Sequence, residues 1–409
     1  MNQKYFIRYK LGSGSFRVYN NETGEITTMK DSPTKYDFFV QSGYEASDEG
    51  LKEYAKDFKR WAEELYNNNV FKICYTNYHS HYTAVLNIFT KMSKKKYTDH
   101  EPIGKTESIW IEACYNGSLQ YCEPQTCKSY ASDFSDMYPS IMTNPKFMIP
   151  TKAGSEKTLK KIPSELKTGY YRVKITCDNK DFKKLFSFSK QHVYTNVSLN
   201  YAQIHQKKYD VNIELIKDGE ANAYVYDETI AGSKIFSWWF YKMLELKKMF
   251  PKNRLVKHLF SSLHGHLIAF NKRNISWKEI EEKGLKVGID EGCDYVIKEY
   301  HLYDNQDYYE VIDPKKPYKY NIRIKPFLSA CARNKTAEVA RKHLKHVVRI
   351  HTDCVVFNKK YDLSDVPFLV SEEKTSGLIK WKNVNSYDKK CNCGEWYHNT
   401  ERQKHKGCS

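Results

Sequence analysis

The segment 133–140, Asp-Phe-Ser-Asp-Met-Tyr-Pro-Ser, places a carboxylate where a strand is expected to turn into a helix. Asp133 ends the strand-like run that precedes it, while Pro139 disfavours helix at Tyr138 and could open a helix itself. A carboxylate beside the backbone carbonyl of Phe134 offers the hard oxygen ligands that Mg²⁺ prefers. The alternative is an exposed Asp at a strand-to-helix turn without a metal.

A second acidic residue, Asp353, lies among apolar residues in the strand-like segment 347–357. A carboxylate inside such a strand is unfavourable unless it is paired or bound to a metal. If the segment folds back as a hairpin, it presents Asp353 beside Asp133. Two carboxylates that bridge two divalent ions suit in-line phosphoryl transfer, in which one ion activates the attacking 3′-oxygen and the other stabilises the departing pyrophosphate.

The segment 257–265, Lys-His-Leu-Phe-Ser-Ser-Leu-His-Gly, supplies positive charge and hydroxyl groups on an expected helix. Lys257, Ser261 and His264 follow one another at i, i+4 and i+7, so they share a face. A lysine there can bind triphosphate oxygens as a point charge, with Arg254 one turn earlier as a second donor. The alternative is a basic amphipathic helix whose charged stripe is solvated.

The elements expected to position these residues alternate between helices and strands. Hydrophobic periodicity favours a helix at 51–66, a long helix at 235–270 divided near Phe250-Pro251, and a helix at 326–347 that precedes the Asp353 strand. Strands are predicted from short apolar or alternating runs at 71–75, 109–115, 130–134 and within 169–226. The stretch 271–325 is predicted to be rich in turns, with short strands.

The composition favours a polyanionic partner. The 409 residues include 66 Lys and Arg against 49 Asp and Glu, which gives a formal charge of +17. Basic surfaces gain affinity for nucleic acids through counterion release, although a merely soluble basic surface would look the same. The 11 Cys form no repeating frame, and neither a signal peptide nor an apolar run of about 18 residues is found. We therefore expect a protein of a reducing compartment such as the cytoplasm, not secreted and not in a membrane.

Taken together, the three motifs resemble those of family B DNA polymerases, specifically the protein-primed branch of phages, adenoviruses and linear plasmids. Residues 133–140 resemble motif A (DxxSLYPS), residues 257–265 resemble motif B (KxxxNSxYG), and residues 349–356 resemble motif C (YxDTDS). The likeness extends over most of residues 105–385. The departures from the family patterns are Asp136 for Ser, Ser261 for Asn, His264 for Tyr, His351 for the first Asp and Cys354 for Ser.

The resemblance implies an α+β right-hand polymerase, with a palm built on an antiparallel sheet, helical fingers and a reduced thumb, preceded by a degenerate RNase H-like exonuclease domain. The expected division is 1–105 exonuclease-like, 106–233 first part of the palm with an insertion at about 167–216, 234–270 fingers, 271–322 second insertion, 323–385 second part of the palm and 386–409 vestigial thumb and basic tail.

The resemblance also implies roles for individual residues. Two Mg²⁺ or Mn²⁺ ions would be held by Asp133, Asp353 and the Phe134 carbonyl, with both carboxylates catalytic. The residues expected at the dNTP are Tyr138, which stacks under the sugar and excludes a ribose 2′-hydroxyl, Arg254, Lys257, Ser261 and His264. The residues expected to contact DNA are Tyr115 and Gly117 of a YxGG-like element, Ser329 and Arg333 of a Tx₂AR-like element, His351, and Lys404 of a weak KxY-like element near the thumb.

The two ends of the chain depart furthest from the family. Asn20, Glu22, Asn77 and Thr83 stand where the first two exonuclease motifs would be, but two of the acids are replaced, so proofreading is expected to be lost. Near the other end, Cys391, Cys393, His398, His405 and Cys408 are zinc-ligand types. Their spacing matches no standard zinc motif, so a polar tail without zinc is favoured.

The function that follows is primer extension by a DNA-directed DNA polymerase with template-primer DNA and dNTPs as partners, acting as a monomer. A protein hydroxyl, from a terminal protein, is one candidate primer by the resemblance. The first alternative is a polymerase-derived DNA-binding protein whose catalysis has decayed. The second is a metal-dependent nuclease or nucleotidyltransferase of another fold, against which the triphosphate-type Lys257 argues.

Overall fold

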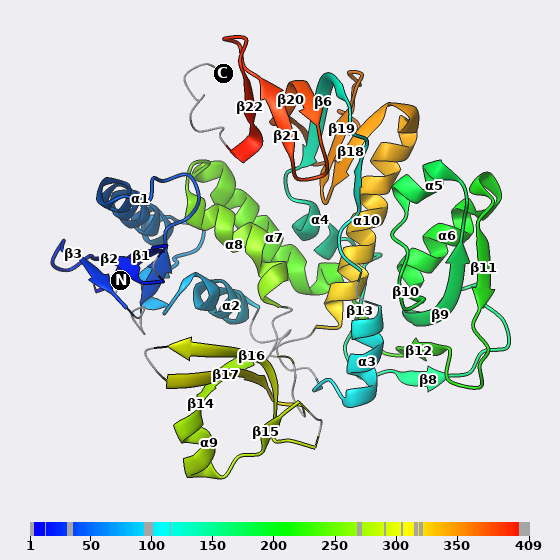
Figure 1. Cartoon of the computed structure of the whole chain (residues 1–409), viewed down its shortest axis with the longest axis horizontal. Coiled ribbons are helices and arrows are strands. Elements are labelled where there is room, and N and C mark those ends of the chain that lie inside the picture. Colours follow the sequence, from blue (N-terminus) through cyan, green and yellow to red (C-terminus); the bar gives the residue numbers. More distant parts are fainter. Residues whose placement is uncertain are drawn as a thin grey trace. The chain divides into compact units, whose positions relative to one another are not determined.

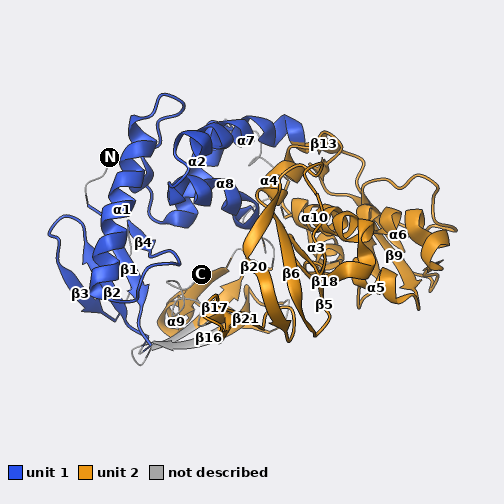
Figure 2. Cartoon of the chain, turned by 90° about the horizontal axis from the view of Figure 1, so that it is seen from above, with its two compact units in different colours: residues 1–100, 233–270, 319–321 blue, residues 101–232, 271–318, 322–409 orange. Residues whose placement is uncertain are grey.

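The structure is a computed structural model that describes residues 4–12, 14–30, 36–93, 101–114, 116–267, 272–289, 292–303, 306–314, 318 and 322–400. The chain forms two compact units (Figure 2). Unit 1 comprises residues 1–100, 233–270 and 319–321, and unit 2 comprises residues 101–232, 271–318 and 322–409. Unit 1 thus joins the N-terminal region to the segment predicted as fingers, whereas the six-part division expected from the sequence stays a prediction.

Unit 1 contains a four-stranded sheet in the order β3-β2-β1-β4 and several helices (Figure 1). Its strands are β1 Phe6–Lys10, β2 Phe16–Asn20, β3 Ile26–Met29 and β4 Asp37–Phe39. Its helices are α1 Asp48–Asn67, η1 Tyr75–Asn77, α2 His81–Met92, α7 Gly232–Met249 and α8 Arg254–His266. The break between α7 and α8 falls at Phe250-Pro251, as predicted, because proline cannot continue the hydrogen-bond ladder of a helix.

Helix α1 confirms the predicted helix and its apolar face. It begins at the cap Ser47, whose hydroxyl accepts from the Gly50 N–H. The buried residues match the predicted stripe: Leu51, Tyr54, Ala55, Phe58, Trp61, Ala62 and Leu65. The strand predicted at 71–75 is wrong. The backbone of this segment bonds instead to the end of α1, where Ile73 N–H donates to Leu65 O over 2.9 Å and Asn68 Oδ1 accepts from Phe71 N–H.

The largest sheet of unit 2 has seven strands in the order β22-β21-β20-β6-β19-β18-β5, all antiparallel. They are β5 Gln120–Cys122, β6 Thr126–Phe134, β18 Val347–His351, β19 Cys354–Phe357, β20 Leu369–Trp381, β21 Tyr387–Lys390 and β22 Trp396–His398. One face buries Ala131, Val348, Val356, Ile379 and Trp381. Helices α4 (Met137–Met142) and α10 (Ile324–Lys342) contact each other, and α10 contacts β18 and β19.

Unit 2 contains three smaller sheets and further helices. A five-stranded sheet consists of β8 Ser155–Lys157, β9 Gly169–Thr176, β10 Val193–Thr195, β11 Asn212–Leu215 and β12 Ala223–Val225. A two-stranded sheet pairs β7 Met148–Pro150 with β13 Thr229–Ala231. A four-stranded sheet consists of β14 Lys272–Ser276, β15 Val287–Gly288, β16 Tyr295–Tyr303 and β17 Gln306–Ile312. The helices are α3 Lys105–Ala113, α5 Lys180–Leu185, α6 Asn196–Tyr209, α9 Trp277–Lys283 and η2 Leu344–His346.

The strand predicted at 109–115 is wrong, because residues 109–113 belong to helix α3; Tyr115 lies outside the described residues. A short apolar run cannot be told from a buried helix by periodicity alone. Here the helix is fixed by partners distant in sequence: Trp110 Nε1–H donates to Glu156 over 2.9 Å, and Glu107 pairs with Arg323. Residues 271–325 hold longer elements than predicted, among them the nine-residue β16 and helix α9.

Within the described residues, no helix is both long enough and apolar enough to cross a membrane.

Candidate active site

The predicted hairpin brings Asp353 to the strand that carries Asp133. Asp133 is the penultimate residue of β6, and Asp353 lies in the two-residue turn between β18 and β19. Cys354, next to Asp353, stands opposite Asp133 across the β19–β6 pair. The backbone N–H of Phe134 donates to the carbonyl oxygen of Asp353 over 3.1 Å. Residues 220 positions apart in the chain are therefore neighbours at one end of the sheet.

The turn that carries Asp353 is held from several sides. Thr352 has a positive φ of 61°, a conformation that β-branched residues adopt at a cost. Its N–H donates to the Leu119 carbonyl over 3.1 Å, and its carbonyl accepts from the Thr336 hydroxyl of α10 over 3.0 Å. The Thr352 hydroxyl also lies 3.1 Å from that of Ser118. The strained turn is thus fixed by neighbours rather than by its own sequence.

The side chains of Asp133 and Asp353 are both half-buried. Burial raises the pKa of Asp353 above its ordinary value. Burial also raises the pKa of the neighbouring Cys354 thiol to about 12, and the charge of Asp133 acts in the same direction. Asp133 and Asp353 thus lie where a bound cation would offset their desolvation.

Lys335 is a residue of this region that the sequence reasoning missed. Its Nζ donates to the Ser140 hydroxyl over 3.0 Å and lies 4.7 Å from the centroid of the Phe134 ring. Burial lowers the pKa of this lysine below its ordinary value. The available signal was a lysine directly before two residues that the helix buries, Thr336 and Ala337.

Tyr138 lies in helix α4 instead of before it. Met137 begins the helix, so Pro139 is its third residue, and Tyr138 is helical although Pro139 was expected to disfavour helix there. The N–H groups of the first turn have no intrahelical acceptor, so the missing N–H of Pro139 removes no hydrogen bond. Tyr138 is half-buried and follows the Asp133 strand by one tight turn.

The residues expected to contact DNA differ in their surroundings. Arg333 is buried, and its Nη1 donates to the carbonyl oxygens of Asn116 and Gly117, each over 2.9 Å. The buried guanidinium therefore holds the backbone of the exposed Gly117 segment in place. Ser329 is half-buried on α10, and His351 is half-buried as the last residue of β18, where burial lowers its pKa. Tyr115 and Lys404 lie outside the described residues, so their roles remain predictions.

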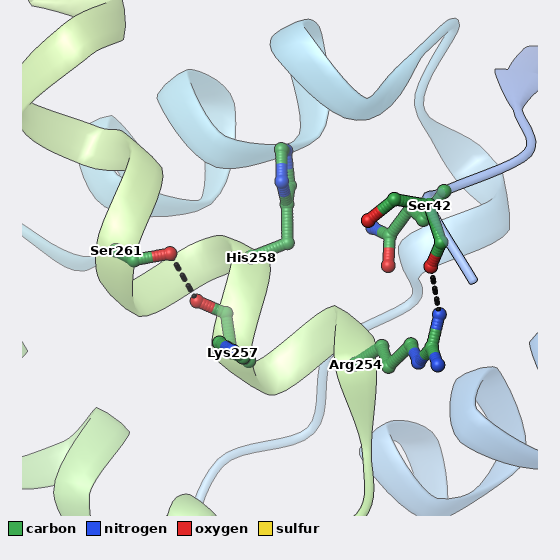
Figure 3. Close-up of a pocket in the computed structure, with 6 residues that line it drawn as sticks. Ser42, Arg254, Lys257, His258 and Ser261 are labelled. Atoms are coloured by element: carbon green, nitrogen blue, oxygen red, sulfur yellow. Dashed lines mark hydrogen bonds between the residues drawn. The ribbon is translucent and has the colours of Figure 1, made fainter. Parts of the chain in front are cut away.

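The expected triphosphate-binding face belongs to unit 1, where it lines a cavity of about 470 Å³. The lining residues are Gln41, Ser42, Arg254, Lys257, His258 and Ser261. Figure 3 shows Lys257 and Ser261 on successive turns of α8, linked by a 2.8 Å hydrogen bond from the Ser261 hydroxyl to the Lys257 carbonyl. Lys257 is exposed, so its ammonium is available to a polyanion.

Arg254 is engaged within unit 1. Its Nη1 donates to the Ser42 carbonyl over 2.6 Å, as drawn in Figure 3. The guanidinium carbon also lies 4.9 Å from the centroid of the Tyr44 ring and 5.9 Å from that of Trp61. These contacts hold the start of α8 against α1 and the residues before it. His264 is mostly buried, which lowers its pKa to about 4, so it is a neutral residue at physiological pH.

The residues expected as exonuclease remnants serve local structure. The Asn20 side chain accepts from the Glu22 N–H over 2.9 Å, and Glu22 pairs with Lys4 at 3.4 Å. Thr83 forms a capping box at the start of α2, with its hydroxyl accepting from the Ser80 N–H over 2.9 Å. Asn77 ends η1 as an exposed residue. The loss of proofreading remains a prediction.

Asp133 and the Phe134 carbonyl at the end of β6, together with Asp353 in the adjacent turn, offer ligands suited to a divalent ion. Two carboxylates and a backbone carbonyl are oxygen ligands of the kind that Mg²⁺ and Mn²⁺ accept, usually completed by water and substrate oxygens. Among the described residues no group of three or more His, Cys, Asp or Glu is arranged to hold a metal. That finding covers Cys391, Cys393 and His398 of the tail, whereas His405 and Cys408 lie outside the described part.

Comparison with solved structures gives a mixed α/β fold that resembles that of a DNA polymerase. Phi29 DNA polymerase is among the solved structures that this fold resembles. Its complex with single-stranded DNA has 11% sequence identity and a TM-score of 0.56, over 90% of this chain and 63% of that chain. Its binary complex with primer-template DNA has 12% identity and a TM-score of 0.55, over 89% and 62%. Its ternary complex with incoming nucleotides has 13% identity and a TM-score of 0.52, over 83% and 59%.

The chain therefore spans about three fifths of the length of the polymerase it matches. No protein-family model and no curated protein sequence matches it.

Proposed function

We propose that the chain is a DNA-directed DNA polymerase of the protein-primed family B type that transfers nucleotides from dNTPs to a primer hydroxyl. The observation that carries this proposal is the pairing of β6 with the β18–β19 hairpin, which sets Asp133 and Asp353 at the same end of the sheet. That arrangement reproduces in space the two carboxylates that the sequence motifs require. The DNA polymerase fold of phi29 is its support at the level of architecture.

The proposed site divides its tasks among the named residues. Asp133, Asp353 and the Phe134 carbonyl would hold two Mg²⁺ or Mn²⁺ ions, which supply Lewis-acid stabilisation of the transferring phosphoryl group when bound. Lys257 binds triphosphate oxygens as a point charge. Tyr138 stacks under the incoming sugar and leaves no room for a 2′-hydroxyl. Ser261 and the neutral His264 lie near the nascent base pair.

The proposal includes template-primer DNA as partner and a terminal-protein hydroxyl as one candidate primer. Because the Arg254 guanidinium donates to the Ser42 carbonyl, Lys257 is the proposed main contact of the triphosphate. The buried Arg333 acts on DNA indirectly, by positioning the Gly117 segment. In domain terms, the seven-stranded sheet with α4 and α10 is the proposed palm, and α7 with α8 the proposed fingers.

A second function is favoured by particular substitutions. His351 replaces an acid in motif C, and Thr83 replaces an acid of the exonuclease motif and caps a helix instead. These changes would suit a DNA-binding protein that has lost its catalysis.

Primer extension separates the two functions. The purified chain is given a primed template, dNTPs and either Mg²⁺ or Mn²⁺, beside Asp353→Asn and the matched control Asp365→Asn, which alters an exposed carboxylate paired with Lys342. Extension by the parent and by the control, with at least about a thousandfold loss in Asp353→Asn, supports the polymerase. DNA binding without extension in either metal favours the second function. Extension that survives Asp353→Asn contradicts the site assignment.

A further inference from the structure

Helix α7 carries a row of large and charged side chains on one face. Lys234, Trp238, Tyr241, Glu245 and Lys248 follow one another at i, i+4, i+7, i+11 and i+14, so they share a face, which we call the α7 stripe. Trp238 is 45% exposed and Tyr241 is 64% exposed. Met249 lies beside the end of the stripe and is also exposed.

The packing of α7 does not require these two aromatic residues. The opposite face supplies the core of the helix with buried Phe236, Trp239, Phe240, Met243 and Leu246. Trp238 contacts the Phe71 ring edge to face, with the centroids 6.1 Å apart, and nearly half of its surface is exposed to solvent. Exposed apolar residues are common singly, but two adjacent large aromatics on one helix face are typical of an interaction surface.

The charges along the stripe are mixed, with an excess of lysine. Lys234 lies one turn before Trp238, and Glu245 lies between Tyr241 and Lys248. Glu245 pairs with Lys242 at 3.3 Å, and among the described residues no ion pair of Lys234 or Lys248 is found. The stripe therefore presents two aromatic rings with a lysine towards each end, on a chain whose formal charge is +17.

We propose that the α7 stripe binds single-stranded nucleic acid, with bases stacked on Trp238 and Tyr241 and backbone phosphates bound by Lys234 and Lys248. The two aromatic residues are about 4.5 Å apart along the helix axis and the two lysines about 21 Å apart. Base stacking on aromatic rings combined with a positive track is the general mode of sequence-tolerant binding to single strands. This binding does not depend on the proposed polymerase activity, since it needs neither a metal ion nor a dNTP.

The observations favour a polyanion over a protein as the occupant. A protein partner would bury the stripe mainly by apolar contact, yet the stripe also carries Lys234, Glu245 and Lys248, and desolvating these charges would be unfavourable. Phosphates reverse that penalty, because each one bound to a lysine releases a counterion. A second copy of this chain would bring the same positive charge and be repelled.

Photo-cross-linking tests the proposal on the full chain. A 5-iododeoxyuridine-substituted oligonucleotide is bound in EDTA, irradiated, and the cross-linked tryptic peptide is identified by mass spectrometry. Trypsin cleaves after Lys234 and Lys242 and so releases the peptide 235–242. We expect the cross-link in this peptide, and we expect it to be lost in the double variant Trp238→Ala/Tyr241→Ala. The matched control Trp277→Ala removes a 51% exposed tryptophan on α9 of unit 2 and should keep the cross-link.

Binding affinity supplies the second readout. By fluorescence anisotropy with a labelled oligo(dT), the aromatic double variant should bind at least about tenfold more weakly. Lys234→Gln/Lys248→Gln should reduce the slope of log affinity against log salt by about 1.4. Circular dichroism checks that each variant is folded.

The outcomes separate this proposal from the polymerase. A parent protein with no cross-link in this peptide overturns it, as does a folded aromatic variant with unchanged affinity. If the substitutions abolish only self-association in sedimentation experiments, the stripe is a protein interface and the proposal is wrong. Asp353→Asn should cross-link like the parent, so failed primer extension beside an intact cross-link would remove the polymerase and leave this binding site.

Discussion

The backbone N–H of Phe134 donates to the carbonyl of Asp353 over 3.1 Å, which ties the end of β6 to the β18–β19 turn. This hydrogen bond adds to the antiparallel pairing of β6 with β19, which holds together the two segments that carry the carboxylates. The main chain beneath both carboxylates is thus held by the sheet. A site for charged ligands needs this kind of support, because partly buried acids repel one another unless a cation joins them.

The turn beneath Asp353 leads to the first prediction. Thr352→Gly relieves a left-handed conformation that costs a β-branched residue roughly 1–2 kcal/mol, but it loses the Ser118 contact and adds chain entropy. We expect an unfolding free energy within about 1 kcal/mol of the parent, by urea denaturation, and a roughly tenfold lower rate of primer extension.

Asp210→Gly is the matched control, since Asp210 has a similar φ of 53° at the end of α6, away from the carboxylates. It should leave extension unchanged. An equal loss of extension in both variants would show that the rate follows general stability and not the turn.

The sequence predicted those parts of the fold that depend on local pattern. The buried face of α1 and the break at Pro251 follow from periodicity and from the missing proline N–H. The segment 347–357, in contrast, divides into β18 and β19, so Asp353 lies in the turn between them and not inside a strand as predicted. The segments at 71–75 and 109–115 were predicted wrongly because distant partners decide them: Leu65 and Asn68 for the first, Glu156 and Arg323 for the second.

The candidate site was predictable to the same extent. The placing of Asp133 and Asp353 required only the order of strands, but the surroundings of single side chains depend on contacts across long sequence separations. Arg254 meets Ser42 and Tyr44, and Lys335 meets Ser140, at positions that no spacing rule connects.

Substitutions of two neighbouring basic residues on α8 are expected to have different effects, one on kinetics and the other on stability. Lys257→Ala should leave stability within about 0.5 kcal/mol, because the side chain is exposed, and lower kcat/KM for dNTP by about 10–100-fold through the loss of one charge-assisted contact. Arg254→Lys should instead destabilise unit 1 by about 1–2 kcal/mol through the loss of the hydrogen bond to Ser42 and of the guanidinium contacts with two rings.

Steady-state extension kinetics and hydrogen exchange of the α1 and α8 peptides measure the two effects. Lys252→Ala, an exposed lysine before α8, is the control for charge alone. A kinetic loss in Arg254→Lys as large as in Lys257→Ala, with exchange unchanged, would assign Arg254 to the triphosphate after all.

Unit 2 contains a buried ion pair, and replacing only one of its two partners is expected to be strongly destabilising. Arg323 Nε and Nη2 lie 2.6 and 2.7 Å from the Glu107 carboxylate, and the two side chains are 0% and 2% exposed. Arg323→Met leaves a buried carboxylate without its cation and should destabilise the unit by about 3–5 kcal/mol. The double variant Glu107→Leu/Arg323→Met should recover most of that loss in thermal unfolding. No recovery would indicate that the bonds of Arg323 to the Glu101 carbonyl and of Glu107 to Tyr226 dominate.

The histidines between α2 and α8 predict acid sensitivity of unit 1. The rings of His81 and His258 have centroids 5.1 Å apart, and those of His258 and His266 are 5.9 Å apart. Burial, followed by the neighbouring histidines, lowers the pKa of His81 to about 3 and that of His266 to about 4. In the unfolded chain both titrate near about 6.5. Between these values the unfolded state binds protons that the folded state excludes, so stability is full above about pH 6.5 and falls as the pH drops towards 4.

Each of these histidines contributes at most about 1.4 kcal/mol per pH unit to that slope. Hydrogen exchange of the α2 and α8 peptides between pH 7 and 5, corrected for the intrinsic pH dependence of exchange, measures it. His266→Gln should make the slope shallower, because glutamine does not titrate and one group with a lowered pKa is removed. The substitution breaks no hydrogen bond of Nε2, which is buried without a partner in the described structure. Ile204→Gln, at an exposed position of α6 in unit 2, should leave the slope as in the parent. If the His266→Gln slope equals that of the parent, protonation of this cluster does not limit the stability of unit 1 in acid.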